Sequence, residues 1–519
     1  MRLNCLSLLR RTFCVLAFFV PYLLNAQPLY DVTRFGAVGD GTTDNTAAIQ
    51  RAIDSSAKTG GKVFFPTGTF LSATLYLKSN ATLHLSAGAI LLGQADASKY
   101  PYQDPGIPFY GDQWAKQALI FCKGQENVTI EGKGTIDGQG ARFVVNTIKK
   151  PDRYKNRPYL LWFAGSKNIT VRDVSLRNSA FWMQHYLGCE FVLIDGIHIW
   201  NHSNKNNDMI DIDGSRNVTI TNITGDSDDD GITIKSTSPR ISENITITNC
   251  IVSSHCNGIK FGTESTGGFR NVTVSNCVIR PSAQRQTIYG KPDGISGLAL
   301  EVVDGGIMEN ITISNIIIEG PQVPIFIRLG NRARKFSDTA AAPSIGRIRH
   351  IRISDIIARG ADTVGCSITG LDKMPVEDIT LSNITIETSG SDIAGKPYSI
   401  VVPEREEDYP EATIFGKLPS YGMYVRYAKD IQLHNIVLRH KGTEQRPGIM
   451  LDRVQRFQLT GLDIQNSSTA PAAVAIARSA EGTITNANRI EGLTNRLRAV
   501  RFVVRDNNTT NVIVDNKRL

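Results

Sequence analysis

A short repeated pattern limits most strongly what this chain can fold into. Copies of an Asn followed by alternating apolar and polar residues begin at Asn168, Asn217, Asn244, Asn271 and Asn310. The middle three are spaced by 27 residues each time (244 − 217 and 271 − 244). Alternation is the periodicity of a β-strand, and the Gly, Asn, Asp and Ser between the copies favour turns. Short strands at a fixed period predict an all-β fold, a single-stranded right-handed parallel β-helix or solenoid.

The N-terminal part of the mature chain predicts a cap for this solenoid. Residues 44–58 begin with polar N-cap residues and then place apolar side chains at 48, 49, 52 and 53, which is one face of a short helix. A solenoid needs such a cover, because its end coil otherwise exposes the core. No Pro-rich or Gly-rich linker follows, so we expect residues 27–519 to form one elongated domain.

The first 26 residues have the pattern of a secretory signal peptide. Arg2, Arg10 and Arg11 precede an apolar stretch at 13–20, and Leu24-Asn25-Ala26 forms a small-residue cleavage site. The apolar stretch is too short to span a bilayer. We therefore expect a secreted or periplasmic protein with no membrane attachment after cleavage; an uncleaved anchor helix is the alternative.

Net charge and cysteine content give no indication of nucleic-acid binding or of a zinc site. Removal of residues 1–26 takes away three basic residues and no acidic ones, so the net charge falls from +8 to about +5 (54 basic against 49 acidic). This excess does not predict nucleic-acid binding, but it is compatible with an acidic polysaccharide. The six remaining cysteines contain no Cys-x-x-Cys pair, so we expect no zinc site, metal or cofactor. Cys250 and Cys277 occupy equivalent repeat positions, which predicts stacked buried thiols. We expect a monomer.

Three aspartates carry the chemical signal. Asp208 precedes one strand and the pair Asp229-Asp230 precedes the next, with an offset of 22 residues (230 − 208). Stacked strands lie about 4.8 Å apart, so one coil of this length places the three carboxylates together on one surface. Carboxylates so close do not all ionise with ordinary pKa values. This is what acid/base cleavage of a glycosidic bond requires.

The repeat also predicts the register around these aspartates. Ile210, Ile232, Ile259, Leu298 and Ile325 form one inward ladder. The columns between the ladders face outward, and they are expected to read Asp208-Asp230-Asn257-Ser296-Val323, Asp211-Thr233-Lys260-Ala299-Phe326 and Asp213-Lys235-Gly262-Glu301-Arg328. One face is therefore predicted to carry the carboxylates with Lys235, Lys260 and Arg328 beside them.

A calcium loop is the competing interpretation of the acidic stretch 226–231. The stretch matches the first half of the EF-hand pattern, but the twelfth position is Thr237 instead of Glu and no flanking helices are predicted. A calcium site of another type remains an alternative.

These residues resemble glycoside hydrolase family 28, the polygalacturonase-like pectin hydrolases, over nearly the whole mature chain. Asn206-Asn207-Asp208 is similar to the family's Asn-Thr-Asp motif, and Asp229-Asp230-Gly231-Ile232-Thr233-Ile234-Lys235-Ser236 to its Asp-Asp-Cys-Ile-Ala-Ile-Lys-Ser segment. The resemblance implies that Asp229 is the general acid and that Asp208 and Asp230 hold the attacking water. It also implies inversion of configuration and a pectin-type, galacturonate-containing substrate.

The chain departs from the family pattern where the substrate carboxylate should be held. Asn257 stands in place of the His of Gly-His-Gly, and Ala299-Leu300-Glu301 in place of Arg-Ile-Lys. We expect Lys260 and Arg328 to grip the carboxylate instead, with Arg328 also near Glu301. His255 and His185, together with Lys235 and Asn257, are the other candidate substrate-binding residues. Trp182 is a candidate sugar platform, and residues 328–335 form a basic loop near the cleft.

Two other functions remain open on the same fold. A polysaccharide lyase would require calcium and a basic residue that abstracts a proton. A non-catalytic carbohydrate-binding or adhesion β-helix would not require aspartates in register. The paired acids on one face favour the hydrolase.

Overall fold

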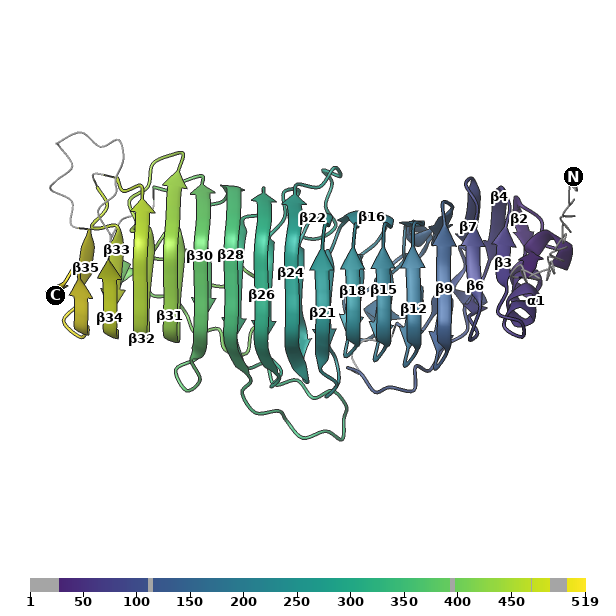
Figure 1. Cartoon of the computed structure of the whole chain (residues 1–519), viewed down its shortest axis with the longest axis horizontal. Helices are drawn as coiled ribbons and strands as arrows, with labels where there is room; N and C mark the ends of the chain where they lie inside the picture. Colours follow the sequence, from purple (N-terminus) through teal and green to yellow (C-terminus); the bar gives the residue numbers. More distant parts are fainter. Residues whose placement is uncertain (1–27, 111–114, 393–396, 468, 486–501) are drawn as a thin grey trace, which may run out of the picture.

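The structure is a computed structural model, and it describes residues 28–110, 115–392, 397–467, 469–485 and 502–519. The expected signal peptide lies outside the described residues. The described strands form one sheet of 37 strands, wound as a right-handed parallel β-helix. Figure 1 shows the elongated solenoid with its coils stacked along the long axis. The fold predicted from the repeat is confirmed.

Three ladders of strands run along the solenoid. The first contains β1 (Leu29–Asp31), β3 (Lys62–Phe65), β6 (Thr82–Leu85), β9 (Glu126–Gly132), β12 (Lys167–Arg172), β15 (Glu190–Asp195), β18 (Arg216–Thr221), β21 (Ser242–Thr248), β24 (Gly268–Arg280), β26 (Ile307–Glu319), β28 (Arg347–Ala361), β30 (Val376–Thr388), β31 (Met423–His440), β32 (Ile449–Ile464), β34 (Ala480–Thr485) and β36 (Thr510–Val514). At the C-terminal end, β37 (Lys517–Arg518) pairs antiparallel with β36. Figure 1 looks onto this ladder.

The second ladder is built from shorter strands. It contains β2 (Asp40–Asp44), β4 (Gly68–Ser72), β7 (Ala89–Gly93), β10 (Thr135–Asp137), β13 (Ser175–Arg177), β16 (His198–Asn201), β19 (Thr224–Ser227) and β22 (Ile251–Ser254). It then merges into the first ladder, because β22 pairs with the second half of the long strand β24.

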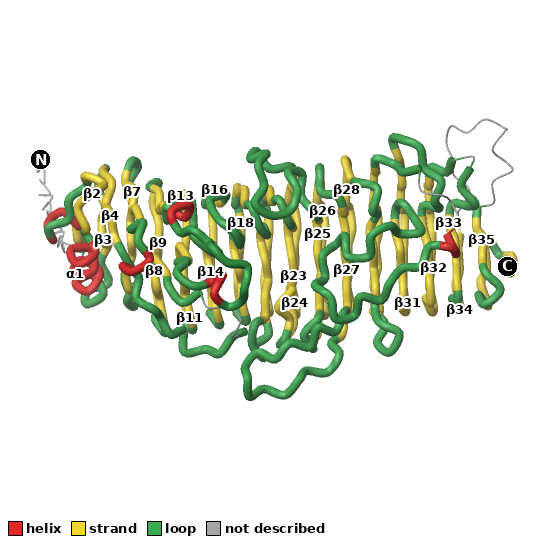
Figure 2. Tube along the Cα trace, turned by 180° about the vertical axis from the view of Figure 1, so that it is seen from behind, coloured by secondary structure: helices red, strands yellow, loops and turns green. Residues whose placement is uncertain are grey.

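The third ladder carries the aspartates. It contains β5 (Leu75–Tyr76), β8 (Ala118–Lys123), β11 (Tyr159–Ala164), β14 (Gln184–Leu187), β17 (Ile210–Asp213), β20 (Ile232–Ser236), β23 (Asn257–Ser265), β25 (Ser296–Val302), β27 (Val323–Leu329), β29 (Cys366–Thr369), β33 (Val474–Ala477) and β35 (Val503–Arg505), with the first parts of β31 and β32 between β29 and β33. Figure 2 shows that long loops cross this side of the molecule.

Helices are few and short. The helix α1 (Thr46–Ser56) lies at the N-terminal end, and it buries Ala48, Ile49, Ala52 and Ile53 against the core. This confirms the predicted cap (Figure 1). The 3-10 helices are η1 (Val32–Phe35), η2 (Ala97–Lys99), η3 (Gly140–Arg142), η4 (Asp152–Tyr154) and η5 (Pro397–Ser399).

The repeated Asn marks a tight turn at the start of the first ladder's strands. Asn217, Asn244 and Asn271 adopt left-handed φ values of 58°, 57° and 56°. Asn tolerates this region better than other residues with a side chain. The side-chain amides of Asn244 and Asn271 each donate to the Asn one coil earlier, Asn244 to Asn217 at 3.2 Å and Asn271 to Asn244 at 3.1 Å. The turn geometry therefore explains why Asn recurs.

The core has the register that the repeat predicts. Ile210 pairs with Ile232, Ile232 with Ile259, and Ile259 with Leu298, all fully buried. Cys250 and Cys277 are free and buried, as expected. One outward column differs from the prediction, because a bulge after Ile234 shifts the pairing to Ser236 with Ser265 and leaves Gly262 out of register.

Candidate active site

The three aspartates lie at the start of adjacent strands of the third ladder. Asp208 lies two residues before β17, and Asp229 and Asp230 lie three and two residues before β20. The Met209 amide donates to the Asp230 carbonyl at 2.9 Å, which aligns these two turns directly. The Gly231 amide donates to the Asn257 carbonyl at 2.8 Å. The predicted column Asp208, Asp230 and Asn257 is confirmed.

A cavity of about 390 Å³ opens over these turns. All three aspartates and Lys235 line it. The remaining wall comes from Trp182, Glu264 and loop residues that include Arg153, Tyr289, Arg332, Arg334, Tyr409 and Glu411. Its size is within the range of small-molecule and sugar sites.

Asp229 is the aspartate that is best placed to donate a proton. Its Oδ1 accepts the Asp230 amide at 3.0 Å, and its Oδ2 lies 3.5 Å from the Asn206 side-chain amide. Ser254 Oγ donates to its carbonyl at 2.6 Å, which fixes the turn. Burial, followed by the neighbouring charge of Asp230, raises the pKa of Asp229 to about 7. Asp229 can therefore hold a proton near neutral pH.

Asp230 and Asp208 are each held by a buried lysine. Asp230 accepts the Asn257 amide at 2.6 Å and Lys260 Nζ at 3.0 Å. These donors stabilise negative charge on Asp230. Asp208 lies 3.3 Å from Lys235 Nζ. Burial, and then the charge of Asp211, raises the pKa of Asp208 well above its ordinary value.

Lys235 forms ion pairs with several acids at the cavity. Its Nζ lies 3.4 Å from Asp211 and 3.5 Å from Glu264, and 4.4 Å from the centre of the Trp182 ring. Burial works against its charge, but Glu264, Asp208 and Asp211 outweigh it and raise the pKa of Lys235. Burial raises the pKa of Asp211 to about 8, although the charge of Lys235 acts in the opposite direction. Lys235 thus compensates charge within the site.

Lys260, which is predicted to grip the substrate carboxylate, is buried outside the cavity lining. Lys260 is 1% exposed. Its Nζ contacts Asp230, the Tyr409 hydroxyl at 3.1 Å and Glu301 at 3.9 Å. A loop that carries Tyr409 covers it, which an outward position in the strand register does not reveal. Lys260 and Asn257 therefore support Asp230 from below.

His185 and His255, two further predicted substrate contacts, also lie outside the cavity lining. His185 is fully buried, with Nε2 3.0 Å from Asp213 Oδ2 and its ring stacked on Trp162. His255 is fully buried beside Asp228, at 2.9 Å.

Arg328 is likewise buried away from the cavity. It donates to the carbonyls of Glu404 and Arg405, at 2.8 and 3.0 Å. It pairs in register with Glu301, but among the described residues no ion pair joins the two side chains. The expected contact between Arg328 and Glu301 is therefore not made.

The basic loop of residues 328–335 supplies cations to the cavity. Arg334 binds Asp304 at 2.6 Å and Glu264 at 3.4 Å, so its charge is compensated. Arg332 lies 5.3 Å from the Tyr409 ring centre, and its Nη1 is buried with no hydrogen-bond partner. The charge pattern of this loop was the only sequence signal for these residues. Tyr409 and Glu411 had none, because their segment lies outside the repeat.

Among the described residues, the carboxylates of the stretch 226–231 do not converge as the ligands of a calcium loop would. Asp226 Oδ1 contacts His202 Nε2 at 2.8 Å, and its Oδ2 accepts the Ala283 amide at 2.8 Å. Asp228 accepts the backbone amides of Ile288 and Tyr289.

Comparison with known proteins gives a consistent family. The sequence model of glycosyl hydrolases family 28 matches residues 58–400. A probable polygalacturonase of Vitis vinifera is 36% identical over 217 residues, which cover 39% of this chain and 43% of that protein. An exopolygalacturonase of Zea mays is 27% identical over 370 residues, which cover 70% of this chain and 84% of that protein. The chain matches less than half the length of the first curated relatives.

The fold is also shared with solved structures. A hyperthermoactive exopolygalacturonase from Thermotoga maritima superposes with a TM-score of 0.59 at 22% identity, covering 80% of this chain and 93% of that one. At this identity the likeness concerns the fold alone.

Proposed function

This chain belongs to glycosyl hydrolases family 28 and is a glycoside hydrolase, and from that membership we propose that it hydrolyses a galacturonate-containing pectic polysaccharide with inversion. The observation that carries the proposal is the cavity in which Asp208, Asp229 and Asp230 meet. Asp229 has a raised pKa there, while Lys235 and Lys260 compensate the other two aspartates.

In the proposed mechanism Asp229 protonates the oxygen of the leaving sugar. Asp208 and Asp230 hold a water on the opposite face of the sugar ring, and one of them takes its proton as the bond breaks. An inverting glycosidase uses its carboxyl groups in this way, with one as the acid and another as the base, and a water lies between the base and the sugar. Lys260 and Asn257 keep Asp230 oriented toward that water.

Arg332 is the residue that we assign to the substrate carboxylate. Lys235 and Arg334 are already paired with acids, whereas Arg332 Nη1 has no hydrogen-bond partner. A planar guanidinium matches a carboxylate in geometry as well as in charge. Arg332 would thus replace the cations that the family places on the strands.

The test compares Arg332→Met on charged and neutral substrates. Loss of a charge-assisted contact of about 1.5–3 kcal/mol should raise KM by roughly 10–100-fold on oligogalacturonates. Methyl-esterified oligomers should respond far less. Lys335→Met is the matched control, because this exposed side chain of the same loop does not line the cavity. Equal effects on both substrates would remove Arg332 from carboxylate recognition.

We further propose exo action on a chain end, because loop residues contribute to the cavity wall. Tyr409 and Glu411 come from the segment before β31 and stand in the cavity wall with Tyr289 and Arg332. Figure 2 shows such loops lying across the third ladder. The Zea mays relative is named an exopolygalacturonase. Release of monomers from the first minutes of digestion supports this, whereas a ladder of oligomers contradicts it.

The reaction class is tested by incubation with polygalacturonate and a panel of other acidic polysaccharides. New reducing ends without ultraviolet absorbance, and unchanged in a calcium chelator, indicate hydrolysis. An absorbing unsaturated product that disappears with chelator would indicate a lyase. No product from any polysaccharide would leave only a binding role.

Secretion is part of the same proposal. A polymeric cell-wall substrate lies outside the cell that digests it, in agreement with the signal pattern of residues 1–26. Among the described residues no helix is long and apolar enough to cross a membrane.

A further inference from the structure

A column of three metal-ligating side chains lies beside the active site. His202, Asp228 and His255 each follow the last residue of a second-ladder strand, β16, β19 and β22. The preceding residues Asn201 and Ser227 pair in register, and so do Ser227 and Ser254. Successive coils therefore stack the three residues directly. One ligand atom from each lies within 4.8 Å of the others.

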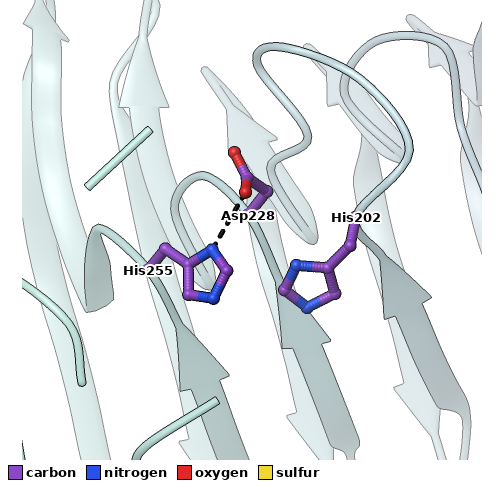
Figure 3. Close-up of side chains that lie close together, drawn as sticks. All are labelled: His202, Asp228 and His255. Carbon is purple, nitrogen blue, oxygen red and sulfur yellow. Dashed lines mark hydrogen bonds and ion pairs between the residues drawn. The ribbon is translucent and has the colours of Figure 1, made fainter. Parts of the chain in front are cut away.

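Both imidazoles are oriented by an acceptor on their far side. His202 Nε2 lies 2.8 Å from Asp226 Oδ1, and His255 Nε2 lies 2.6 Å from the Gln284 carbonyl oxygen. A carbonyl can only accept, and an ionised carboxylate likewise, so each Nε2 carries the hydrogen. Nδ1 is then the atom that each ring presents to Asp228, as Figure 3 shows. Metal-binding histidines are commonly oriented in this way.

One of these nitrogens lacks a partner. His202 Nδ1 is buried without a hydrogen bond, and the His202 side chain is 2% exposed. A buried acceptor without a partner is unfavourable, because it loses its hydrogen bond to water on folding. Asp228 and His255 are fully buried, and His255 Nδ1 lies 2.9 Å from Asp228 Oδ1. The lone pair of His202 therefore points into a buried group that contains a carboxylate and a second imidazole.

We propose that His202, Asp228 and His255 bind one divalent transition-metal ion, with Zn²⁺ as the best match. Two imidazole nitrogens and a carboxylate oxygen are ligands that zinc accepts. Binding forms bonds from the metal to His202 Nδ1, His255 Nδ1 and Asp228. The proton between His255 Nδ1 and Asp228 leaves to solvent, since the ligand nitrogen must be deprotonated.

The ion would link three successive coils next to the catalytic turns. Asp228 directly precedes Asp229, and His202 begins the segment that leads to Asp208. Asp228 also accepts the amides of Ile288 and Tyr289, so the ion would extend to the loop that carries Tyr289 into the cavity wall. Its role is structural, and it is independent of the sugar specificity proposed above.

The test uses the untagged full chain after dialysis against a chelator. Titration with ZnCl₂ in calorimetry at pH 7, in two buffers of different ionisation enthalpy, should show one ion per chain and about one proton released. Thermal unfolding should shift upward with zinc. His202→Gln should weaken binding by more than the roughly 10–100-fold that loss of an outer partner costs. His198→Gln, an exposed histidine at the start of β16, should bind as the wild type does.

If His202→Gln fails to fold, the visible absorption spectrum of the Co²⁺-loaded wild type tests the site instead. Visible absorption with intensity typical of nitrogen and oxygen ligation, titrating to one equivalent and displaced by Zn²⁺, supports the site. The proposal is overturned if the folded wild type takes up no zinc, or if folded His202→Gln binds it as tightly as the wild type. In that outcome His255 donates from both nitrogens to Asp228 and Gln284 as an imidazolium. Hydrolysis measured on the same preparations reports on the proposed function separately.

Discussion

At the scale of single residues, the site divides acids by their surroundings. Asp229 is only partly buried and has a raised pKa, whereas Asp230 is held between the Asn257 amide and Lys260. Pairs of carboxyl groups whose environments differ in this way commonly separate into acid and base. These neighbours agree with the roles that the motif positions imply for Asp229 and Asp230, and the pKa of Asp208 is raised as well.

Replacement of the proton donor gives the first prediction. Asp229→Asn keeps the shape but cannot donate, so kcat/KM should fall by about 10²–10⁴-fold with unchanged circular dichroism. In the wild type the pKa of Asp229 is raised to about 7, so the acid form persists up to that pH. The kcat/KM profile should therefore decline as pH rises through about 7. A folded Asp229→Asn with full activity would exclude Asp229 as the acid.

Lys260→Met tests whether this lysine acts on Asp230 or on substrate. Because Nζ contacts Asp230 and does not line the cavity, the substitution should lower kcat and leave KM nearly unchanged. Lys260 also lowers the pKa of Asp229, so its removal should move the alkaline limb of the kcat/KM profile to higher pH. A rise in KM at constant kcat, measured by initial rates on oligogalacturonates, would restore Lys260 as a substrate contact.

At the scale of elements, the Asn turn shows what a repeat can and cannot predict. The alternation of apolar and polar residues predicts the strands, and the repeat period predicts how they pair from one coil to the next. Both can be predicted because each strand of a solenoid contacts only its neighbours. The pairs Ile210–Ile232 and Asp211–Thr233 were predictable for this reason. The bulge after Ile234 and the loop that carries Tyr409 were not, since neither repeats. The outward register of Lys260 predicts exposure, but the loop that carries Tyr409 covers this residue.

The turn itself can be tested at Asn244. Its φ of 57° favours Asn or Gly, and the left-handed conformation costs other residues about 1–2 kcal/mol. Asn244→Ala should therefore lower the unfolding temperature, while Asn244→Gly should remain closer to the wild type despite loss of the amide ladder. Thermal unfolding followed by circular dichroism decides. Equal destabilisation by Ala and Gly would assign the effect to the hydrogen-bonded ladder instead.

At the scale of the whole molecule, a uniform solenoid provides one face and non-repeating loops complete the site. The aspartates come from the strand turns, whereas Arg153, Tyr289, Arg332 and Tyr409 reach the cavity from loops far apart in the chain. The proposed metal ligands escaped sequence analysis for a related reason. His202, Asp228 and His255 are separated by 26 and 27 residues (228 − 202 and 255 − 228), so only the stacking of coils brings them together.

Water-mediated hydrolysis by the three aspartates determines the anomeric form of the first product. One relative is named an exo-poly-alpha-D-galacturonosidase, so an α-linked oligogalacturonate is the appropriate substrate. Proton NMR recorded in the first minutes, before mutarotation, should show the β-anomer of the new reducing end. A first product in the α-configuration would contradict the account.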